Sequence, residues 1–320
     1  MYGSEPFLLV DLYSLNDEST RVGNHVFELL GSIALARKLN RTLLVHTTAA
    51  ERIHRENGEL LNIWPDMNLI FSSEVMPFVT VFDYFNFDCC RFNPGISELN
   101  DCPDSVILVK LKYIQSYKYV QSLELTEIRH LLAMNETMTR IARENLIPPE
   151  KLAQSDHKLC VHSRRGDFLH TYVQAYSTTD FTLPAIQFVL NQLNSSVERP
   201  LVIMIGDDLE WQKEITQLLK KSSIESMLLP RSKETNSPLV DWQFSEMYCD
   251  TVLITGSAST FGWWLAHVSK GQKVYYNSVY QKGNRFGDMF HPEDFFPPYW
   301  ISLTLESSQL IQRLPANFEG

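Results

Sequence analysis

The feature that most constrains the fold is a regular alternation of buried strands and amphipathic helices in the second half of the chain. Each helical pattern is long enough to cross back over a sheet, and each apolar strand pattern is short enough to be one strand of it. Such alternation is typical of α/β proteins with a parallel sheet. The predicted strands cover residues 158–163, 201–205, 226–229, 251–255 and 273–276, and the predicted helices cover 181–193, 209–221, 240–249 and 260–269.

The first half contains a second, less regular pattern of the same kind. A strand at 7–13, a helix at 24–39 and a strand at 42–46 make one strand–turn–helix–strand unit. The apolar residues of that helix fall on one face at helical spacing. Further along, we expect a short strand at 68–71, a strand at 105–112 and a long helix at 126–146.

Two adjacent prolines, Pro148 and Pro149, interrupt the pattern near the middle of the chain. Because they cannot continue a helix, we place a domain boundary there, with one domain at 1–150 and the other at 151–320. Two α/β halves joined by such a linker make a cleft. Ligands of open α/β sheets bind beyond the carboxyl ends of the strands, so functional residues are expected where the strands end.

The charge balance argues against a nucleic-acid-binding protein. The net charge is −10 and the isoelectric point about 5.4, whereas nucleic-acid binding depends on clustered Lys and Arg. An anionic ligand would therefore need a local basic pocket. No run of 18 apolar residues predicts a transmembrane helix, and the N-terminus lacks the pattern of a secretory signal. The sequence is expected to be a cytosolic protein or the soluble part of a longer one.

The five cysteines have neither zinc-ligand spacing nor the pattern of a disulfide framework. Cys89 or Cys90 could close a small loop with Cys102 in an oxidising compartment, and free buried thiols are the equal alternative. Three Asn-x-Ser/Thr triplets give weak support for a secretory location, at Asn40, Asn135 and Asn194.

The sharpest motif is His-Ser-Arg-Arg-Gly-Asp-Phe at residues 162–168, directly after a predicted strand. It puts two guanidinium groups at a carboxyl end of the sheet, where they would suit a phosphate or diphosphate. A fixed Arg there would stabilise a departing nucleoside diphosphate without a metal. The structural alternative is an ion pair between an arginine and Asp167. Residues 165–167 also spell the Arg-Gly-Asp adhesion tripeptide, which is a weak signal.

A second candidate site is the small, hydroxyl-rich turn in residues 253–262, which joins a strand to a helix carrying two tryptophans. Its Ser and Thr hydroxyls and helix-start N–H groups could bind an anion. The alternative is a simple helix cap by Ser257 or Ser259, which is compatible with anion binding.

Weaker signals lie elsewhere. Gly23 and Asn24 form a glycine turn at a helix start, for which a plain turn is the simpler interpretation. Asp207 and Asp208 follow a strand and could serve a metal, a ribose or a helix cap. The nine histidines show no metal-ligand spacing, and neither His-Glu-x-x-His nor Asp-x-Asp occurs.

Taken in order, these motifs resemble those of the α-1,2-fucosyltransferases, glycosyltransferase family 11. The turn at 23–27 is similar to the family's first motif, and residues 162–168 to its His-x-Arg-Arg-x-Asp-Tyr/Phe motif. Residues 241–264 resemble the third region, with its Thr-Phe-Gly-x-Trp core, and residues 290–300 the family's tail. The resemblance spans roughly residues 22–303. This chain departs from the family at His25, where Gln is usual, and at Ala258, where Asn is frequent.

The resemblance implies a GT-B-like fold of two Rossmann-like domains, with the acceptor side at 1–150 and the GDP-fucose-binding side at 151–320. It implies inversion at the fucose carbon, an acceptor glycan as partner, and no required metal or other cofactor. Arg164 is then the catalytic residue on the diphosphate, and Arg165 and Asp167 support it. Arg165 is expected to point the other way, as a structural ion-pair partner for which Asp167 is the candidate. The donor-binding residues that the resemblance adds are Gly23, Asn24, His162, Asp241, Ser257, Ser259 and Thr260.

Family resemblance also implies the Golgi or secretory lumen, with any membrane contact made by a segment not visible in this chain. One alternative keeps the fold and changes the bond: an O-fucosyl or α-1,6-fucosyl transferase. Another changes the class: an inactive homologue acting as a glycan-binding or adhesion module through residues 165–167. The acceptor cannot be read from the sequence, and the general base is open among Asp11, Glu28 and Asp83.

Overall fold

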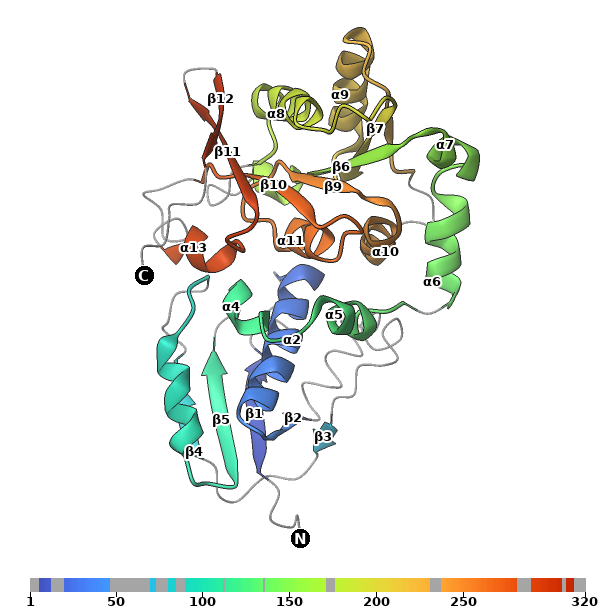
Figure 1. Cartoon of the computed structure of the whole chain (residues 1–320). Coiled ribbons are helices and arrows are strands. Elements are labelled where there is room, and N and C mark those ends of the chain that lie inside the picture. Colours follow the sequence, from blue (N-terminus) through green and yellow to red (C-terminus); the bar gives the residue numbers. More distant parts are fainter. Residues whose placement is uncertain are drawn as a thin grey trace. The chain divides into compact units, whose positions relative to one another are not determined.

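The chain divides into two compact units in a computed structural model (Figure 1). Unit 1 contains Met1–Asn135 and Met289–Pro297, and unit 2 contains Glu136–Asp288 and Pro298–Gly320. The structure describes residues 6–12, 20–46, 70–72, 80–84, 90–111, 113–134, 136–170, 176–230, 237–280, 289–306 and 309–313. Among these residues, no helix has both the length and the apolar character needed to cross a bilayer.

Unit 1 is built on a parallel sheet with strand order β3-β2-β1-β5-β4. The predicted strands at 7–13, 42–46 and 105–112 are found, and residues 13, 68–69 and 112 lie outside the described part. One strand, β4, was not predicted from the sequence. The strands are β1 Phe7–Leu12, β2 Thr42–His46, β3 Ile70–Ser72, β4 Thr80–Asp83 and β5 Val106–Leu111.

Helix α2 packs against β1 and β2 and completes the predicted strand–helix–strand unit. Its residues 25–36 are all buried, so more than one face of the helix is covered. Gly31 allows the close approach of a neighbouring segment, because a Cβ there would lie 2.8 Å from the Ile114 side chain. The helices of unit 1 are α2 Val22–Lys38, η1 Pro94–Asp101, α4 Tyr117–Val120, α5 Leu125–Leu131 and α13 Pro292–Phe295.

The expectation of one long helix at 126–146 is wrong. The segment is divided into α5, α6 Glu136–Arg140 and the π-helical turn η2 Ile141–Asn145. The chain changes from unit 1 to unit 2 inside this segment, and one rigid helix could not serve both cores. The proline pair begins a helix instead, with Pro149 as the first residue of α7 Pro149–Gln154, where its missing N–H is tolerated. The proposed division at residue 150 therefore lies within unit 2.

Unit 2 has a seven-stranded sheet with order β12-β11-β10-β9-β6-β7-β8. All its strand pairs are parallel except that of the edge strand β12. Every strand predicted in this half is present within two residues of its expected ends, and β11 and β12 are additional. The strands are β6 His157–Ser163, β7 Pro200–Gly206, β8 Ser226–Leu228, β9 Thr251–Ile254, β10 Lys273–Asn277, β11 Ile301–Glu306 and β12 Gln309–Arg313.

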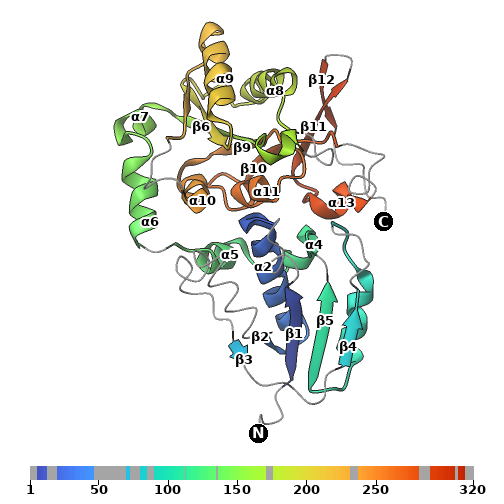
Figure 2. The same ribbon diagram turned by 180° about the vertical axis from the view of Figure 1, so that it is seen from behind.

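Helices cover both faces of this sheet, with α8 and α9 on one face and α10 and α11 on the other (Figures 1 and 2). Because both faces are covered, the central strands are apolar throughout: all four residues of β9 are buried. The helices not yet given are η3 Asp167–Leu169, α8 Thr179–Asn191, α9 Leu209–Lys221, α10 Pro238–Tyr248 and α11 Thr260–His267.

One disulfide crosslinks unit 2, between Cys160 in β6 and Cys249 at the end of α10. This bridge corrects the expectation from the sequence. Cys90 is buried and Cys102 is partly exposed, and the two do not form a disulfide with each other; Cys89 lies outside the described residues. Spacing could not reveal the bridge, because its partners are 89 residues apart and only the pairing of β6 with β9 brings them together.

Candidate functional site

The three strongest sequence signals of unit 2 meet at one edge of its sheet. Strand β6 lies between β7 and β9, with Ser163 opposite Gly206 and His162 opposite Ile254. The carboxyl ends of the three strands therefore lie side by side, which is where open α/β sheets bind ligands. The segments that leave this edge are 164–168 after β6, 207–208 after β7 and 255–259 after β9.

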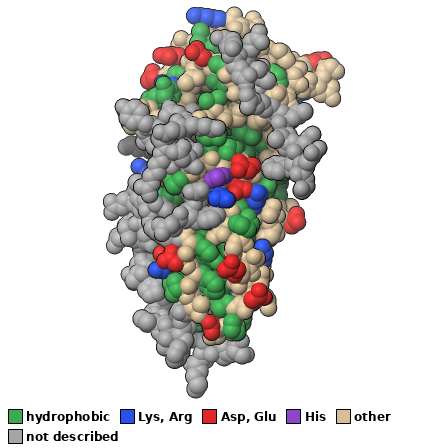
Figure 3. Space-filling view, turned by 90° about the vertical axis from the view of Figure 1, so that its left-hand side faces the viewer, with side chains coloured by type: hydrophobic (Ala, Val, Ile, Leu, Met, Phe, Trp, Pro, Cys, Tyr) green, Lys and Arg blue, Asp and Glu red, His purple; other side chains and the backbone are tan. Residues whose placement is uncertain are grey.

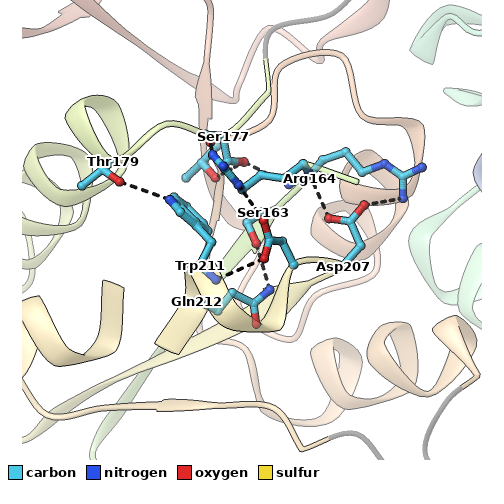
Figure 4. Close-up of polar contacts among 10 residues, drawn as sticks. Ser163, Arg164, Ser177, Thr179, Asp207, Trp211 and Gln212 are labelled. Carbon is cyan, nitrogen blue, oxygen red and sulfur yellow. Dashed lines mark hydrogen bonds and ion pairs between the residues drawn. The ribbon is translucent and has the colours of Figure 1, made fainter. Parts of the chain in front are cut away.

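Arg164 lies between the carboxylates of Asp167 and Asp207, and Figure 4 shows its contact with Asp207. Its Nη2 is 2.7 Å from Asp167 Oδ1, and its Nη1 is 3.2 Å from Asp207 Oδ2. The guanidinium also lies 5.3 Å from the centre of the Phe168 ring. Its Nε is buried and has no hydrogen-bond partner among the described residues. The side chain, 21% exposed, is thus held at both Nη atoms and keeps one donor unused.

The backbone of Arg164 is fixed by Ser177, which no sequence motif indicated. The Arg164 N–H donates to Ser177 Oγ at 2.9 Å, and the Ser177 N–H donates to the Arg164 carbonyl at 3.0 Å. Thr255 Oγ1 lies 2.7 Å from Ser177 Oγ and 2.9 Å from the His162 carbonyl oxygen. Ser177 and Thr255 are fully buried, so this network is internal to unit 2. Ser177 lacks a sequence signal because only the turn after β6 brings it back to Arg164.

Arg165 has a separate set of partners. Its Nε lies 2.9 Å from Asp208 Oδ2, and its Nη1 donates to the Ser177 carbonyl at 2.7 Å. The guanidinium packs near two aromatic rings, 4.9 Å from the Trp211 centroid and 5.5 Å from that of Tyr176. These contacts are those of a structural side chain.

The suggested pairing of Arg165 with Asp167 is wrong. Asp167 binds Arg164, and Arg165 binds Asp208. The reason is local: the extended conformation of β6 ends before Gly166, whose φ of −11° and ψ of −101° turn the chain into η3. That turn brings the carboxylate three residues onward back to the first arginine.

Asp207 and Asp208 perform different tasks. Asp208 caps helix α9 by accepting from the Trp211 N–H at 3.1 Å, which confirms the cap interpretation for this residue. Asp207 accepts from the Arg165 N–H at 2.9 Å through Oδ1 and binds Arg164 through Oδ2. Among the described residues, no group of three His, Cys, Asp or Glu side chains could hold a metal ion.

His162 joins the end of β6 to the start of α11. Its Nε2 lies 3.1 Å from Ser259 Oγ, and that oxygen accepts from the Gly262 N–H at 3.2 Å as the cap of α11. A Cβ on residue 262 would lie 2.3 Å from His162 Cδ2, so glycine is needed there. The ring of Phe261 stacks on Trp242 with centroids 5.1 Å apart. These contacts explain the Thr-Phe-Gly-x-Trp core: it fits a helix start closely against a buried histidine.

The turn before α11 lies directly against Arg164. A Cβ on Gly256 would be 2.8 Å from Arg164 Cβ. Ala258 has a left-handed backbone with φ of 57°, and Thr260 is the first residue of the helix. The Oγ of Ser257 is buried and without a hydrogen-bond partner among the described residues. Of the two predicted caps, Ser259 is the one that caps the helix, so the Ser257 hydroxyl is left for another use.

Other predicted residues lie on other elements. Asp241 lies in the first turn of α10 and is buried, with 1% of its surface exposed. Gly23 and Asn24 lie in the first turn of α2, in unit 1. The three candidates for a general base also belong to unit 1: Asp11 in β1, Glu28 buried in α2, and Asp83 in β4.

Charges of both signs are mixed on one face of the molecule. On the face drawn in Figure 3, Lys and Arg side chains are interspersed with Asp and Glu side chains. With a net charge of −10, attraction for an anion has to come from a local group such as Arg164.

Comparison with solved structures and with other sequences defines the family. The structure is similar to fucosyltransferase NodZ from Bradyrhizobium, with a TM-score of 0.52, 11% sequence identity, and coverage of 98% of this chain and 99% of that one. This likeness confirms the predicted α/β, GT-B-like fold class with two Rossmann-like units.

Two relatives are galactoside 2-alpha-L-fucosyltransferases of Caenorhabditis elegans. One is 28% identical, over 91% of this chain and 76% of the relative, and the other is 31% identical, over 88% and 76%. The sequence model described as Glycosyl transferase family 11 matches residues 111–304. This match includes the arginine motif, the Ser257 turn and the tail, and the chain therefore belongs to glycosyltransferase family 11.

Proposed function

We propose that this protein transfers L-fucose from GDP-fucose to a hydroxyl group of an acceptor glycan, as a galactoside 2-α-L-fucosyltransferase. The observation that carries the proposal is the pair of unused buried groups at the sheet edge. Arg164 Nε is a donor without a hydrogen-bond partner in the described part of the chain, and the Ser257 Oγ lies in the turn that contacts Arg164. A buried polar group without a partner costs about 1–3 kcal/mol, and oxygens of a bound diphosphate would satisfy both.

In this proposal Arg164 stabilises the leaving group. The acceptor oxygen bonds to the fucose anomeric carbon on the face opposite the diphosphate, the bond to the diphosphate oxygen breaks, and the hydroxyl proton leaves the acceptor. Negative charge therefore grows on GDP during the step, where a guanidinium that is already positioned stabilises it. Inversion follows from attack on the opposite face. Asp11, Glu28 and Asp83 stay the candidates for the base that receives the proton.

Guanine recognition is assigned to His162 and Asp241. An ionised Asp side chain accepts hydrogen bonds from the guanine N1–H and amino group, which uracil and cytosine do not offer in that arrangement. Ser257, Ser259 and Thr260 are proposed to face the phosphates, and Gly23 and Asn24 are also proposed to bind the donor. We also propose that the reaction needs no divalent metal, because Arg164 supplies positive charge at the diphosphate.

The protein is proposed to act in the Golgi or secretory lumen. The disulfide between Cys160 and Cys249 supports an oxidising compartment. Asn40 and Asn194, two of the possible glycosylation sites, are exposed, as glycan attachment requires.

The test is a transfer assay with the purified protein, GDP-fucose and a glycan array, followed by linkage analysis of the product. Transfer to the 2-hydroxyl of a terminal galactose, retained in EDTA, is the expected result. A 6-linked product or transfer to a protein hydroxyl would favour the alternative transferases. Glycan binding with neither transfer nor donor hydrolysis would instead identify a glycan-binding or adhesion module. Calorimetry should give tighter binding of GDP than of UDP or CDP, and equal affinities would count against the guanine assignment.

A further inference from the structure

We infer that Asp207 is a positioning residue, which sets the direction of the Arg164 guanidinium toward the donor diphosphate. The inference rests on the function proposed above. Asp207 uses both carboxylate oxygens within the arginine motif: Oδ2 lies 3.2 Å from Arg164 Nη1, and Oδ1 accepts from the Arg165 N–H at 2.9 Å. Figure 4 shows its side chain directed from the end of β7 toward Arg164. One carboxylate thus fixes both the side chain of the first arginine and the backbone that follows it.

The position of Asp207 is itself fixed by close packing. A Cβ on Gly166 would lie 2.7 Å from Asp207 Oδ2, so the arginine loop touches the carboxylate directly. Gly206, the residue before it, lies so near β6 that a Cβ would be 2.1 Å from the Ser163 carbonyl oxygen. Because there is no room for a side chain at Gly166 or Gly206, the position of the Asp207 carboxylate is set by the position of β7. The pairing of β6 with β7 therefore determines where Asp207 holds the guanidinium.

Asp167, the second partner of Arg164, is less suited to this task. Its side chain is 51% exposed, compared with 28% for Asp207, and it belongs to the three-residue turn η3. An exposed carboxylate on a short turn can leave the guanidinium when a diphosphate arrives, whereas Asp207 is tied to the backbone by its second oxygen. The geometry therefore assigns the permanent contact to Asp207.

Asp208 provides a matched control. It is the next residue, it is also a partly exposed carboxylate, and it binds the other arginine, Arg165. Asp207→Asn and Asp208→Asn therefore remove one negative charge each from neighbouring positions. Only the first change affects the guanidinium proposed to meet the diphosphate.

The first experiment measures kcat/KM for fucose transfer in both variants. Asp207→Asn is expected to lower kcat/KM by about 10²-fold, mostly in kcat, since a small misplacement of a catalytic group has an effect of that order. Asp208→Asn is expected to change it less than about threefold while lowering the unfolding temperature through the lost ion pair with Arg165, because asparagine can still cap α9. Equal losses in the two variants would overturn the inference.

A double-mutant cycle with Arg164→Lys separates positioning from folding. If Asp207 acts through the guanidinium, Asp207→Asn should have little further effect on kcat/KM once that guanidinium is absent. A structural role would instead give the same loss in both backgrounds. Asp207→Glu should not rescue activity, because the contact with Gly166 leaves no room for a longer side chain.

A third measurement does not depend on the proposed function. NMR of the Arg164 guanidinium, identified by its absence in Arg164→Lys, should show restricted rotation in the wild-type protein and in Asp208→Asn, and free rotation in Asp207→Asn. An unchanged Arg164 signal in Asp207→Asn would refute the inference even in an active enzyme. Failure of the wild-type protein to bind GDP or transfer fucose would refute the proposed function, and the NMR comparison would still decide whether Asp207 orients Arg164.

Discussion

At the scale of single residues, two adjacent arginines have different partners. Arg164 binds two carboxylates that are themselves partly exposed and keeps its Nε unused. Arg165 is bound to Asp208 and to a backbone carbonyl, and it packs near Trp211. The first arrangement suits a group that meets a ligand, and the second suits a group that holds a loop to helix α9. Substitutions at the two positions should therefore have different consequences.

Arg164→Lys is expected to lower kcat/KM for fucose transfer almost as much as Arg164→Ala. Lysine keeps the charge but loses the planar arrangement of donors that can bind Asp207 and a diphosphate together. Loss of one such stabilising donor has an effect of about 10²–10³-fold, or about 2.7–4 kcal/mol. Steady-state kinetics measures turnover and thermal unfolding measures folding, and the variant should stay folded. Wild-type turnover in a folded Arg164→Lys variant would remove Arg164 from the mechanism.

Arg165→Lys is the control for that experiment. It loses the contact with the Ser177 carbonyl and the packing near Trp211, and hydrogen bonds of charged groups contribute about 1.5–3 kcal/mol. We expect a lower free energy of unfolding, with the folded enzyme retaining its turnover.

Gly262→Ala is expected to lower the free energy of unfolding, although alanine is normally the better helix residue. The added Cβ would lie 2.3 Å from Cδ2 of the buried His162 ring, and overpacking of this kind costs about 1–3 kcal/mol. Urea unfolding measures the cost. In a His162→Ala background the clash is absent, and the same substitution should become neutral or stabilising by up to about 1 kcal/mol. A loss of equal size in both backgrounds would contradict this explanation.

At the scale of elements, strand β6 carries a pH-dependent contact at its start. The Nε2 of His157 lies 3.0 Å from Thr251 Oγ1 on β9, and burial lowers the pKa of the imidazole, although Asp250 acts in the opposite sense. Between the lowered folded pKa and the unfolded value of about 6.5, the unfolded chain binds more protons. Stability from this group is therefore complete above about pH 6.5 and is lost as the pH falls through that window.

His157→Gln should make the stability of unit 2 less dependent on pH. Glutamine keeps a hydrogen-bonding side chain for Thr251 and does not titrate. Urea unfolding at about pH 7.5 and about pH 5 measures the difference, given the unfolded pKa near 6.5. The wild-type protein should lose more stability than the variant on acidification. The same loss in both proteins would show that other groups cause the acid sensitivity.

Elements with a strong local pattern could be predicted from the sequence, and those decided by the tertiary structure could not. The predicted parallel strands of unit 2 agree with the observed ones because they are short apolar runs buried on both faces. The 162–168 motif was also correctly expected at a strand end. The helix expected at 126–146 follows local propensity, but the change of unit inside it divides the segment. Asp207 and Ser177 were missed as partners of Arg164, because only strand pairing and a turn bring them to it.

At the scale of the whole molecule, the chain passes between its two units more than once. Residues 289–297 return to unit 1 before the chain completes the sheet of unit 2. In unit 1, this segment is held by an ion pair between Asp294 and Lys118, by a hydrogen bond from the Phe92 N–H to Asp294, and by packing of Phe295 near Phe27. Each unit nevertheless has its own sheet and core, so the two are expected to unfold in separate transitions.

The disulfide and the residues proposed to bind guanine and the diphosphate, His162, Asp241 and Arg164, belong to unit 2, so reductant and GDP should act on the same calorimetric transition. The bridge closes a separation of 89 residues, for which chain entropy predicts about 4–5 kcal/mol. The Cys160→Ser/Cys249→Ser variant identifies the transition of unit 2, because loss of the bridge lowers the temperature of that transition. Cys90→Ser, in unit 1, should leave that temperature unchanged.

GDP at about 100 times its dissociation constant should then raise the free energy of unfolding for that transition by about 2.7 kcal/mol. UDP at the same concentration should raise it less. A GDP effect on the disulfide-independent transition alone would move the donor site to unit 1, because a ligand stabilises the unit whose folded form it binds. An effect on both transitions is expected only if contacts from the Gly23 and Asn24 turn contribute to affinity. Substitution of Asn24 by Ala should then abolish the GDP-induced stabilisation of unit 1 and leave the GDP-induced stabilisation of unit 2.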